Sequence, residues 1–305
     1  MSAMSLLATS PGFLIGACLV LGLVVGSFLN VVIHRVPIMM QRQWREQCEE
    51  LERPDHAATV PATPAVVKER FNLIVPRSSC PACRAPITAV QNIPILSYLF
   101  LRGRCAQCRV RISVRYPIVE ALTGILSAAV AWKLGFGWPM AAGLVLTWFL
   151  VALAFIDIDQ QLLPDSLTLP LLWLGLFLSL FAATAGGAPI PVDMGSSIIG
   201  AIAGYLCLWT VYHLFRLLTA KEGMGYGDFK LLAALGAWLG WQMLLPTVLI
   251  AAAVGAVAGI ALLAARRQSR SVPIAFGPFL AAAGWLMLMF GRELVADYLG
   301  LFTSR

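Results

Sequence analysis

The run FLIGACLVLGLVVGSFLNVVI, at residues 13–33, contains no charged side chain and is followed directly by His34 and Arg35. A helix of about 20 apolar residues spans the roughly 30 Å hydrocarbon core of a bilayer. The run is longer than the apolar core of a signal peptide, and basic residues follow it instead of a small-residue cleavage site. It therefore predicts a first membrane span that is retained.

Similar apolar runs recur along the rest of the chain. The chain is 59% hydrophobic and 12% charged, whereas a soluble domain carries roughly 25% charged residues. A large soluble core is the alternative, but such a core does not need so many uninterrupted apolar runs. We expect an all-α polytopic membrane protein with about eight transmembrane helices, at residues 13–33, 117–134, 138–156, 166–184, 195–217, 229–243, 245–264 and 273–291.

The basic residues are distributed unevenly, and this distribution orients the spans. Lys and Arg collect in cytoplasmic loops. Residues 34–116 hold 13 of the 22 basic residues, and with the N-terminus outside, 19 of the 22 fall on the cytoplasmic side. Both termini are then outside, and the excess positive charge lies at the cytoplasmic membrane face. We therefore expect membrane lipid as a partner, and no nucleic acid.

This topology divides the chain into three parts. Residues 1–33 are the first transmembrane helix, residues 34–116 are a cytoplasmic loop domain, and residues 117–305 are a seven-helix membrane core. Within the loop domain, the polar segment 38–53 predicts a short helix. Residues 54–67, which are rich in Pro and Ala, predict a linker.

Two cysteine pairs in the loop domain, Cys80-Pro-Ala-Cys83 and Cys105-Ala-Gln-Cys108, are separated by 21 residues. Two such CxxC turns can place four thiolates tetrahedrally around Zn²⁺. Two disulfides, a redox role or free thiols are the alternatives, and a reducing cytoplasm disfavours disulfides. Four thiolates leave no position for water, so the zinc is expected to be structural, as a staple for a small domain.

Several acidic residues lie at the ends of the predicted spans, where insertion costs roughly 2.5–3.5 kcal/mol each. Asp157 and Asp159 close the third span, Asp165 precedes the fourth, and Asp228 opens the sixth in Gly-Tyr-Gly-Asp. Glu120 lies early in the second span. The simpler interpretations are helix capping by Asp165 or Ser166 and by Asp228, and solvation of Asp157 and Asp159 by interfacial water.

The predicted topology nevertheless places Asp157, Asp159 and Asp228 at one membrane face, so that two of them can share a site. Mutual repulsion lets a carboxylate pair hold a single proton. The ionised member can take a proton from water while the protonated member polarises a peptide carbonyl. Gly225 and Gly227 let the backbone approach an extended substrate closely. The pattern favours an aspartic peptidase.

The chain resembles the type IV prepilin peptidases, which are bifunctional leader peptidases and N-methyltransferases of bacterial inner membranes. The resemblance covers most of the chain. It rests on these residues: Gly26-Ser27-Phe28-Leu29-Asn30-Val31-Val32 with Arg35 and Pro37, both CxxC pairs, Asn92-Ile93-Pro94, Ser97-Tyr98, Leu101-Arg102-Gly103-Arg104-Cys105, Ile112-Ser113-Val114-Arg115-Tyr116-Pro117, Glu120, residues 157–165 and residues 225–230.

This resemblance implies a GxGD-type aspartic peptidase that removes the leader of type IV prepilins and pseudopilins at the cytoplasmic face. The first catalytic Asp of the family stands seven residues before a Pro, which selects Asp157 before Pro164, and the second is Asp228 of GxGD. Substrate positioning is assigned to Gly225, Gly227 and Lys230.

The resemblance also implies methylation of the new N-terminal residue from S-adenosylmethionine. The methyltransferase activity is assigned to the cysteine loop, with Gly103 and Arg104 as candidates. A zinc-knuckle turn and a solvated charge are the alternative interpretations of these two residues.

Two other functions compete with the peptidase. Acids and glycine breaks inside membranes also mark ion pathways, but transporters usually have repeated halves with midplane sites. A zinc-bearing scaffold of a secretion machine would leave the Asp157 and GxGD patterns without a purpose. Incubation with a prepilin peptide separates all three functions.

The uneven charge distribution predicts the topology. Reporter fusions within residues 34–116 and near residues 221 and 268 are expected to report the cytoplasm. Fusions near residues 136, 188 and the C-terminus are expected to report the outside. A cytoplasmic C-terminus would show that the number of spans is wrong.

Overall fold

The computed structural model describes residues 7–51, 70–88, 90–181, 190, 192–221, 223–266 and 275–303. Two isolated antiparallel bridges are the only β-pairing within these ranges. The α-helices are α2 (Pro11–Leu51), α3 (Leu96–Phe100), α4 (Arg115–Leu134), α5 (Trp138–Gln160), α6 (Asp165–Ser179), α7 (Met194–Thr219), α8 (Tyr226–Leu239), α9 (Leu244–Arg266) and α10 (Gly277–Thr303). Two 3₁₀ turns, Val90–Asn92 and Trp241–Met243, complete the set. The all-α class is confirmed.

Each predicted span overlaps one of the helices α2 and α4–α10. Within the described residues, five segments are long and apolar enough to cross a membrane: Pro11–Leu51, Arg115–Leu134, Trp138–Gln160, Met194–Thr219 and Trp241–Ala261. The helix α6 is shorter than predicted and ends at Ser179, and α10 continues well past residue 291. The membrane class is therefore confirmed, whereas the count of eight spans stays a prediction.

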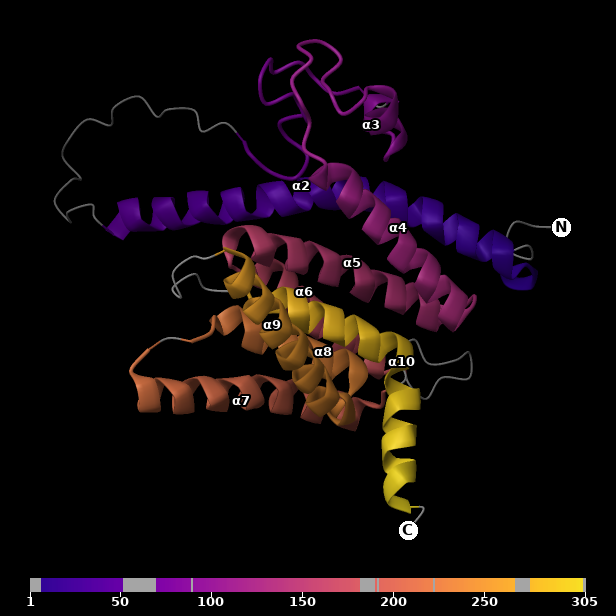
Figure 1. The fold of residues 1–305 in the computed structure, drawn as a ribbon, viewed down its shortest axis with the longest axis vertical. Coiled ribbons are helices and arrows are strands. Elements are labelled where there is room, and N and C mark those ends of the chain that lie inside the picture. The colour runs from indigo at the N-terminus through magenta and orange to yellow at the C-terminus, as the bar shows by residue number, and fades with distance from the viewer. Residues whose placement is uncertain are drawn as a thin grey trace.

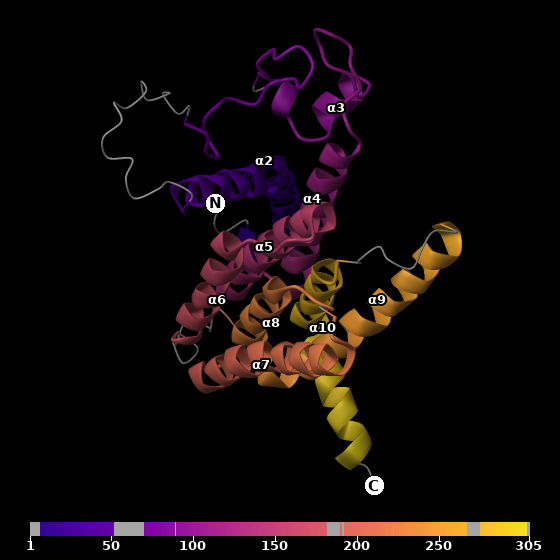
Figure 2. The same ribbon diagram turned by 90° about the vertical axis from the view of Figure 1, so that its left-hand side faces the viewer.

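The first span and the predicted polar helix are in fact one helix, α2, of 41 residues. The prediction of a separate helix at 38–53 was wrong, because Pro37 is accommodated within α2 and the following residues are good helix formers. The predicted linker at 54–67 lies outside the described residues. In Figures 1 and 2, α2 and α4 lie together on one side of the bundle, and the segment that contains α3 projects from this side.

The core of the bundle is the short helix α8, which packs against α6, α7, α9 and α10 (Figure 2). From Asp228 to Leu239, every residue of α8 except Lys230 is buried. A helix that is apolar all round is stable only where neighbours cover every face. The central position of α8 therefore fixes where Asp228, in its first turn, is held.

The helices α7 and α8 approach so closely that only glycines fit between them. A Cβ atom on Gly236 would lie 2.1 Å from the carbonyl oxygen of Gly200, and one on Gly200 would lie 2.3 Å from that of Gly236. The Ser197 hydroxyl donates a hydrogen bond to the Ala237 carbonyl oxygen at 2.7 Å. Small residues and interhelical hydrogen bonds of this kind hold helices together in lipid, where the hydrophobic effect between helices is absent.

Candidate active site and metal centre

Asp157 lies in the last turn of α5 and is 5% exposed. Its Oδ2 atom accepts a hydrogen bond of 3.0 Å from the backbone N–H of Gly277, the first residue of α10. A Cβ atom on Gly277 would lie 2.5 Å from this oxygen, so a larger residue cannot occupy the position without a shift. Gly277 was not among the residues predicted from the sequence. The Gly-Pro pair at the start of a helix was the available signal.

Asp228 lies in the first turn of α8 and is 6% exposed. The N-cap of α8 is Gly225, with no side-chain cap bond, so Asp228 does not cap the helix. Among the described residues, its Oδ1 atom has no hydrogen-bond partner. Gly227, directly before Asp228, packs against Leu163, as does Gly277, which bonds to Asp157, so the segments that carry the two carboxylates meet.

Leu163 forms a wall beside both carboxylates. A Cβ atom on Gly227 would lie 2.6 Å from the Leu163 Cβ atom, and one on Gly277 would lie 3.2 Å from Leu163 Cδ1. Gly227 and Gly277 thus allow the starts of α8 and α10 to approach the segment that follows α5. The site is a narrow junction of three backbone segments.

Asp159 points away from this junction, as two residues along a helix correspond to about 200° of rotation. It forms an ion pair with Arg115, the first residue of α4. The Arg115 guanidinium also donates to the Phe155 carbonyl oxygen at 3.3 Å. Asp159 therefore joins the end of α5 to the start of α4.

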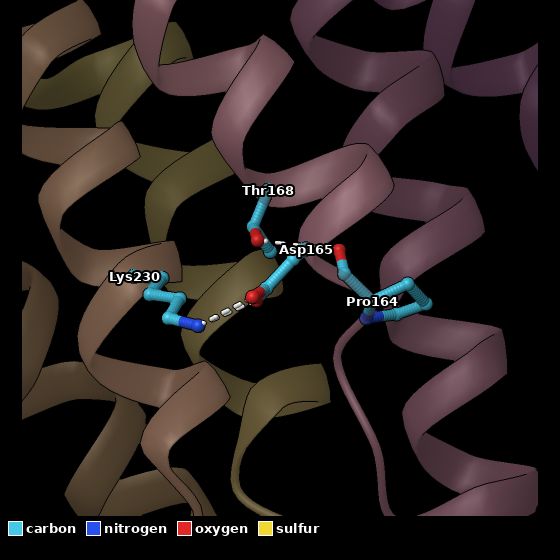
Figure 3. Close-up of polar contacts among 4 residues, drawn as sticks. All are labelled: Pro164, Asp165, Thr168 and Lys230. Atoms are coloured by element: carbon cyan, nitrogen blue, oxygen red, sulfur yellow. Dashed lines mark hydrogen bonds and ion pairs between the residues drawn. The ribbon is translucent and has the colours of Figure 1, made fainter. Parts of the chain in front are cut away.

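Asp165 was expected to cap α6, and this prediction was wrong. The N-cap is Pro164, with no side-chain cap bond. Figure 3 shows Asp165 reaching across to α8, where Lys230 Nζ lies 2.6 Å from Oδ1 and 2.7 Å from Oδ2. The Thr168 hydroxyl instead donates to the Pro164 carbonyl oxygen at 3.2 Å. The ion pair ties the first turn of α6 to that of α8.

The four predicted cysteine ligands converge. The sulfur atoms of Cys80, Cys83, Cys105 and Cys108 all lie within 4.8 Å of one another. The Cys80–Cys108 pair is 3.7 Å apart and the Cys83–Cys105 pair is 4.0 Å apart. Tetrahedral Zn–S bonds of 2.3 Å place sulfur atoms about 3.8 Å apart. Disulfide-bonded sulfurs would be about 2.0 Å apart. The cluster fits a tetrathiolate metal site.

The two CxxC turns have matching backbones. Arg84 and Arg109, each directly after the second cysteine of its pair, have φ of 58° and 60°. In the first turn, the N–H groups of Cys83 and Ala82 donate to the Cys80 sulfur and lower its pKa to about 6. Hydrogen bonds from Cys108 and Gln107 lower the pKa of Cys105 in the same way. Thiolates are the form that binds metal.

The methyltransferase candidates lie beside the second turn. Gly103 has φ of 65°, and a Cβ atom there would lie 2.7 Å from the Tyr98 hydroxyl oxygen. Its carbonyl oxygen accepts a hydrogen bond of 2.8 Å from the Ile112 N–H. Arg104 is exposed and pairs through its backbone with Arg111. The knuckle turn by itself accounts for the glycine at 103.

A polar cavity of about 320 Å³ separates α2 from the end of α5 and the start of α4. It is lined by Asn30, Ile33, His34, Pro37, Ile38, Gln41, Ser113, Arg115, Tyr116, Asp159 and Gln160. The ion pair of Asp159 with Arg115 is part of its wall. The cavity therefore lies on the side of α5 opposite to Asp157.

Comparison with known protein families matches most of the chain. Residues 20–134 match the model of the bacterial Peptidase A24 N-terminal domain, and residues 144–260 match that of the type IV leader peptidase family. The chain is 51% identical to a prepilin leader peptidase/N-methyltransferase of Stutzerimonas stutzeri, over 98% of both chains. Proteins of the same name from Aeromonas hydrophila and Neisseria gonorrhoeae are 55% and 48% identical, covering 92% and 93% of both chains. No solved structure matches the chain.

The geometry of the cysteine cluster predicts its metal content. Purified protein is expected to contain about one zinc ion per chain, measured by elemental mass spectrometry. Replacing all four cysteines by Ser should remove the metal, while Cys48→Ser, which changes an exposed cysteine outside the cluster, should not. Full zinc content in the quadruple variant would refute the assignment.

Proposed function

The chain belongs to the type IV leader peptidase family, and from this premise we propose that it cleaves the leader of type IV prepilins and pseudopilins and methylates the new N-terminus. The proposal places it in the bacterial inner membrane, with both termini outside and cleavage at the cytoplasmic face. The observation that supports the peptidase activity is that the segments carrying the buried Asp157 and Asp228 meet beside Leu163 at one end of the bundle.

The two carboxylates differ in their surroundings, and this difference suggests their roles. Asp157 accepts a hydrogen bond from the Gly277 N–H, which stabilises an ionised carboxylate. Asp228 has a buried, unpartnered Oδ1 among the described residues, which suits a protonated carboxyl group that awaits a carbonyl oxygen. We assign Asp157 as the general base and Asp228 as the general acid.

In the proposed reaction, Asp157 takes a proton from a water molecule, and the water oxygen bonds to the scissile carbonyl carbon. Asp228 donates its proton to the carbonyl oxygen and stabilises the tetrahedral intermediate. The C–N bond then breaks as the leaving nitrogen receives the proton held by Asp157, while one hydroxyl group of the intermediate returns its proton to Asp228, which restores both carboxyl groups. The products are the leader with a new carboxyl group and a pilin with a free amine.

Gly225, Gly227 and Lys230 are proposed to position the reacting groups. Gly227 permits the approach of α8 to Leu163, and Gly225 precedes the helix in an extended conformation. Lys230 binds Asp165, so we propose that it positions Asp228, two residues before it, rather than contacting substrate itself. An exposed ion pair adds only about 0–1 kcal/mol of stability, so its role is one of geometry.

Methylation requires a donor, which we propose to be S-adenosylmethionine in the 320 Å³ cavity. The volume falls in the usual range of roughly 300–1,000 Å³ for small-molecule sites, and polar groups line it. The Gly103 carbonyl oxygen accepts a hydrogen bond from the N–H of Ile112. Ile112 precedes Ser113 of the cavity wall, so Gly103 acts on the donor site indirectly, by positioning this wall. Arg104 remains a candidate residue for the methyltransferase activity because of its positive charge. The zinc cluster holds this wall in place.

The carboxylate pair is tested by replacing single acids. Asp157→Asn and Asp228→Asn are each expected to lower prepilin cleavage by at least about 100-fold, because Asn cannot ionise or share a proton. Asp159→Asn should keep most of the activity, and Asp165→Asn should lower it by less than the catalytic variants do. Cleavage is measured by gel shift in membranes, with protein level as the control. Normal cleavage by Asp228→Asn would refute the mechanism.

The donor site is tested by direct binding. In equilibrium dialysis with labelled S-adenosylmethionine, His34→Ala is expected to weaken binding about tenfold by removing a polar wall group. Prepilin cleavage by His34→Ala should be unchanged. The control variant Gln107→Ala, in an exposed turn, should bind S-adenosylmethionine as the natural chain does. Unaltered binding by His34→Ala would move the donor elsewhere, whereas no binding by the natural chain would refute the methyltransferase function.

A further inference from the structure

We propose that the segment 93–100, with α3 at its end, inserts into the cytoplasmic leaflet and that the arginines after it bind anionic lipid headgroups. The proposal goes beyond the function above and rests on its membrane topology. It changes the sequence-based expectation that all of residues 34–116 stay in the cytoplasm. Depth, exposed apolar side chains and charge each support it.

The depth of the segment follows from its contacts with α2 and α4. The backbone N–H of Ile95 donates a hydrogen bond of 2.8 Å to Glu120 Oε2. Glu120 lies three residues inside the predicted second span, which begins at residue 117, or roughly 4.5 Å along the helix axis. The Ser27 hydroxyl, roughly 9 Å inside the predicted end of the first span, donates to Asn92 Oδ1 at 3.5 Å. The segment from Asn92 to Ile95 therefore lies at the depth of residues that are inside the predicted membrane spans.

This contact also explains an acid that the peptidase mechanism does not use. Glu120 is 8% exposed, although it lies within a predicted membrane span. Buried acids in membranes need a specific partner. The N–H of Ile95, which directly precedes α3, is that partner. Glu120 thus holds the start of α3 against α4.

The helix α3 presents large apolar side chains that the protein does not cover. Leu96 is 53% exposed, Leu99 is 65% exposed and Phe100 is 84% exposed. Side chains of this size in a single turn are unfavourable in water and favourable among acyl chains. An interfacial helix buries its apolar face about 5–10 Å deep, which agrees with the level of Ser27 and Glu120.

The positive charge around α3 favours the anionic surface of the cytoplasmic leaflet as its partner. Residues 70–119 contain eight Arg and no Asp or Glu, and Arg102 and Arg104 follow α3 directly. Basic side chains next to an interfacial helix bind anionic headgroups. The apolar helix of a pilin is the competing occupant. However, α3 lies on the outer side of the α2–α4 pair (Figures 1 and 2). Asp157 instead lies in the last turn of α5, bonded to the start of α10, and Asp228 lies in the first turn of α8.

The experiment places a photo-crosslinking amino acid at Phe100 and, as a matched control, at Gln107, which is exposed in the second CxxC turn. The full chain is reconstituted in nanodiscs of phosphatidylethanolamine and phosphatidylglycerol, and adducts are identified by mass spectrometry. We expect at least about fivefold more lipid adduct at 100 than at 107, enriched in phosphatidylglycerol. Added prepilin should not displace it.

Equal adduct yields at the two positions would overturn the insertion, and a prepilin adduct that replaces lipid would assign the surface to substrate instead. In Arg102→Gln/Arg104→Gln, the enrichment in phosphatidylglycerol should be lost, and its persistence would refute the charge contribution. In Glu120→Ala with zinc content unchanged, the lipid adduct at 100 should fall. Prepilin cleavage by the same nanodiscs reports separately on the proposed function.

Discussion

A carboxylate in an apolar interior must have a hydrogen-bond donor or keep a proton, and the bundle is arranged around two carboxylates under this constraint. Asp157 receives the first N–H of α10, which ties α10 to the end of α5. Asp228 is carried by α8, whose remaining faces are apolar and covered by four other helices. Close packing through Gly200 and Gly236 leaves α8 little freedom to move. The site is consequently rigid where it is buried.

The other acids at the same end of the bundle meet the constraint differently. Asp159 and Asp165 are partly exposed and each pairs with a basic side chain on another helix. Such pairs add little stability, but they fix which helix ends lie together. Asp159 and Asp165 therefore join helix ends, whereas Asp157 and Asp228 are buried and are the pair that we propose to be catalytic. Local environment, rather than residue type, separates these roles.

The cysteine domain is fixed to the membrane helices by polar contacts. The Arg35 guanidinium, within the continuous helix α2, donates to the carbonyl oxygens of Asn72 and Pro76 at 2.8 and 2.6 Å. Glu120 holds the other side of the domain through Ile95. These contacts place the domain beside the cavity, whose wall includes Ser113 at the end of the domain.

The sequence by itself determined the helical membrane class, the four-cysteine cluster and the family, because apolar run length, CxxC spacing and motif residues are local properties. It also singled out Asp157 and Asp228 through spacing to Pro164 and through GxGD. Only the tertiary structure decided the partners of these groups. The Gly277 N–H on Asp157, the Asp165–Lys230 pair in place of a cap, and the return of Ile95 to Glu120 join residues 120, 65 and 25 positions apart. Such contacts depend on how helices pack, and no local pattern records that packing.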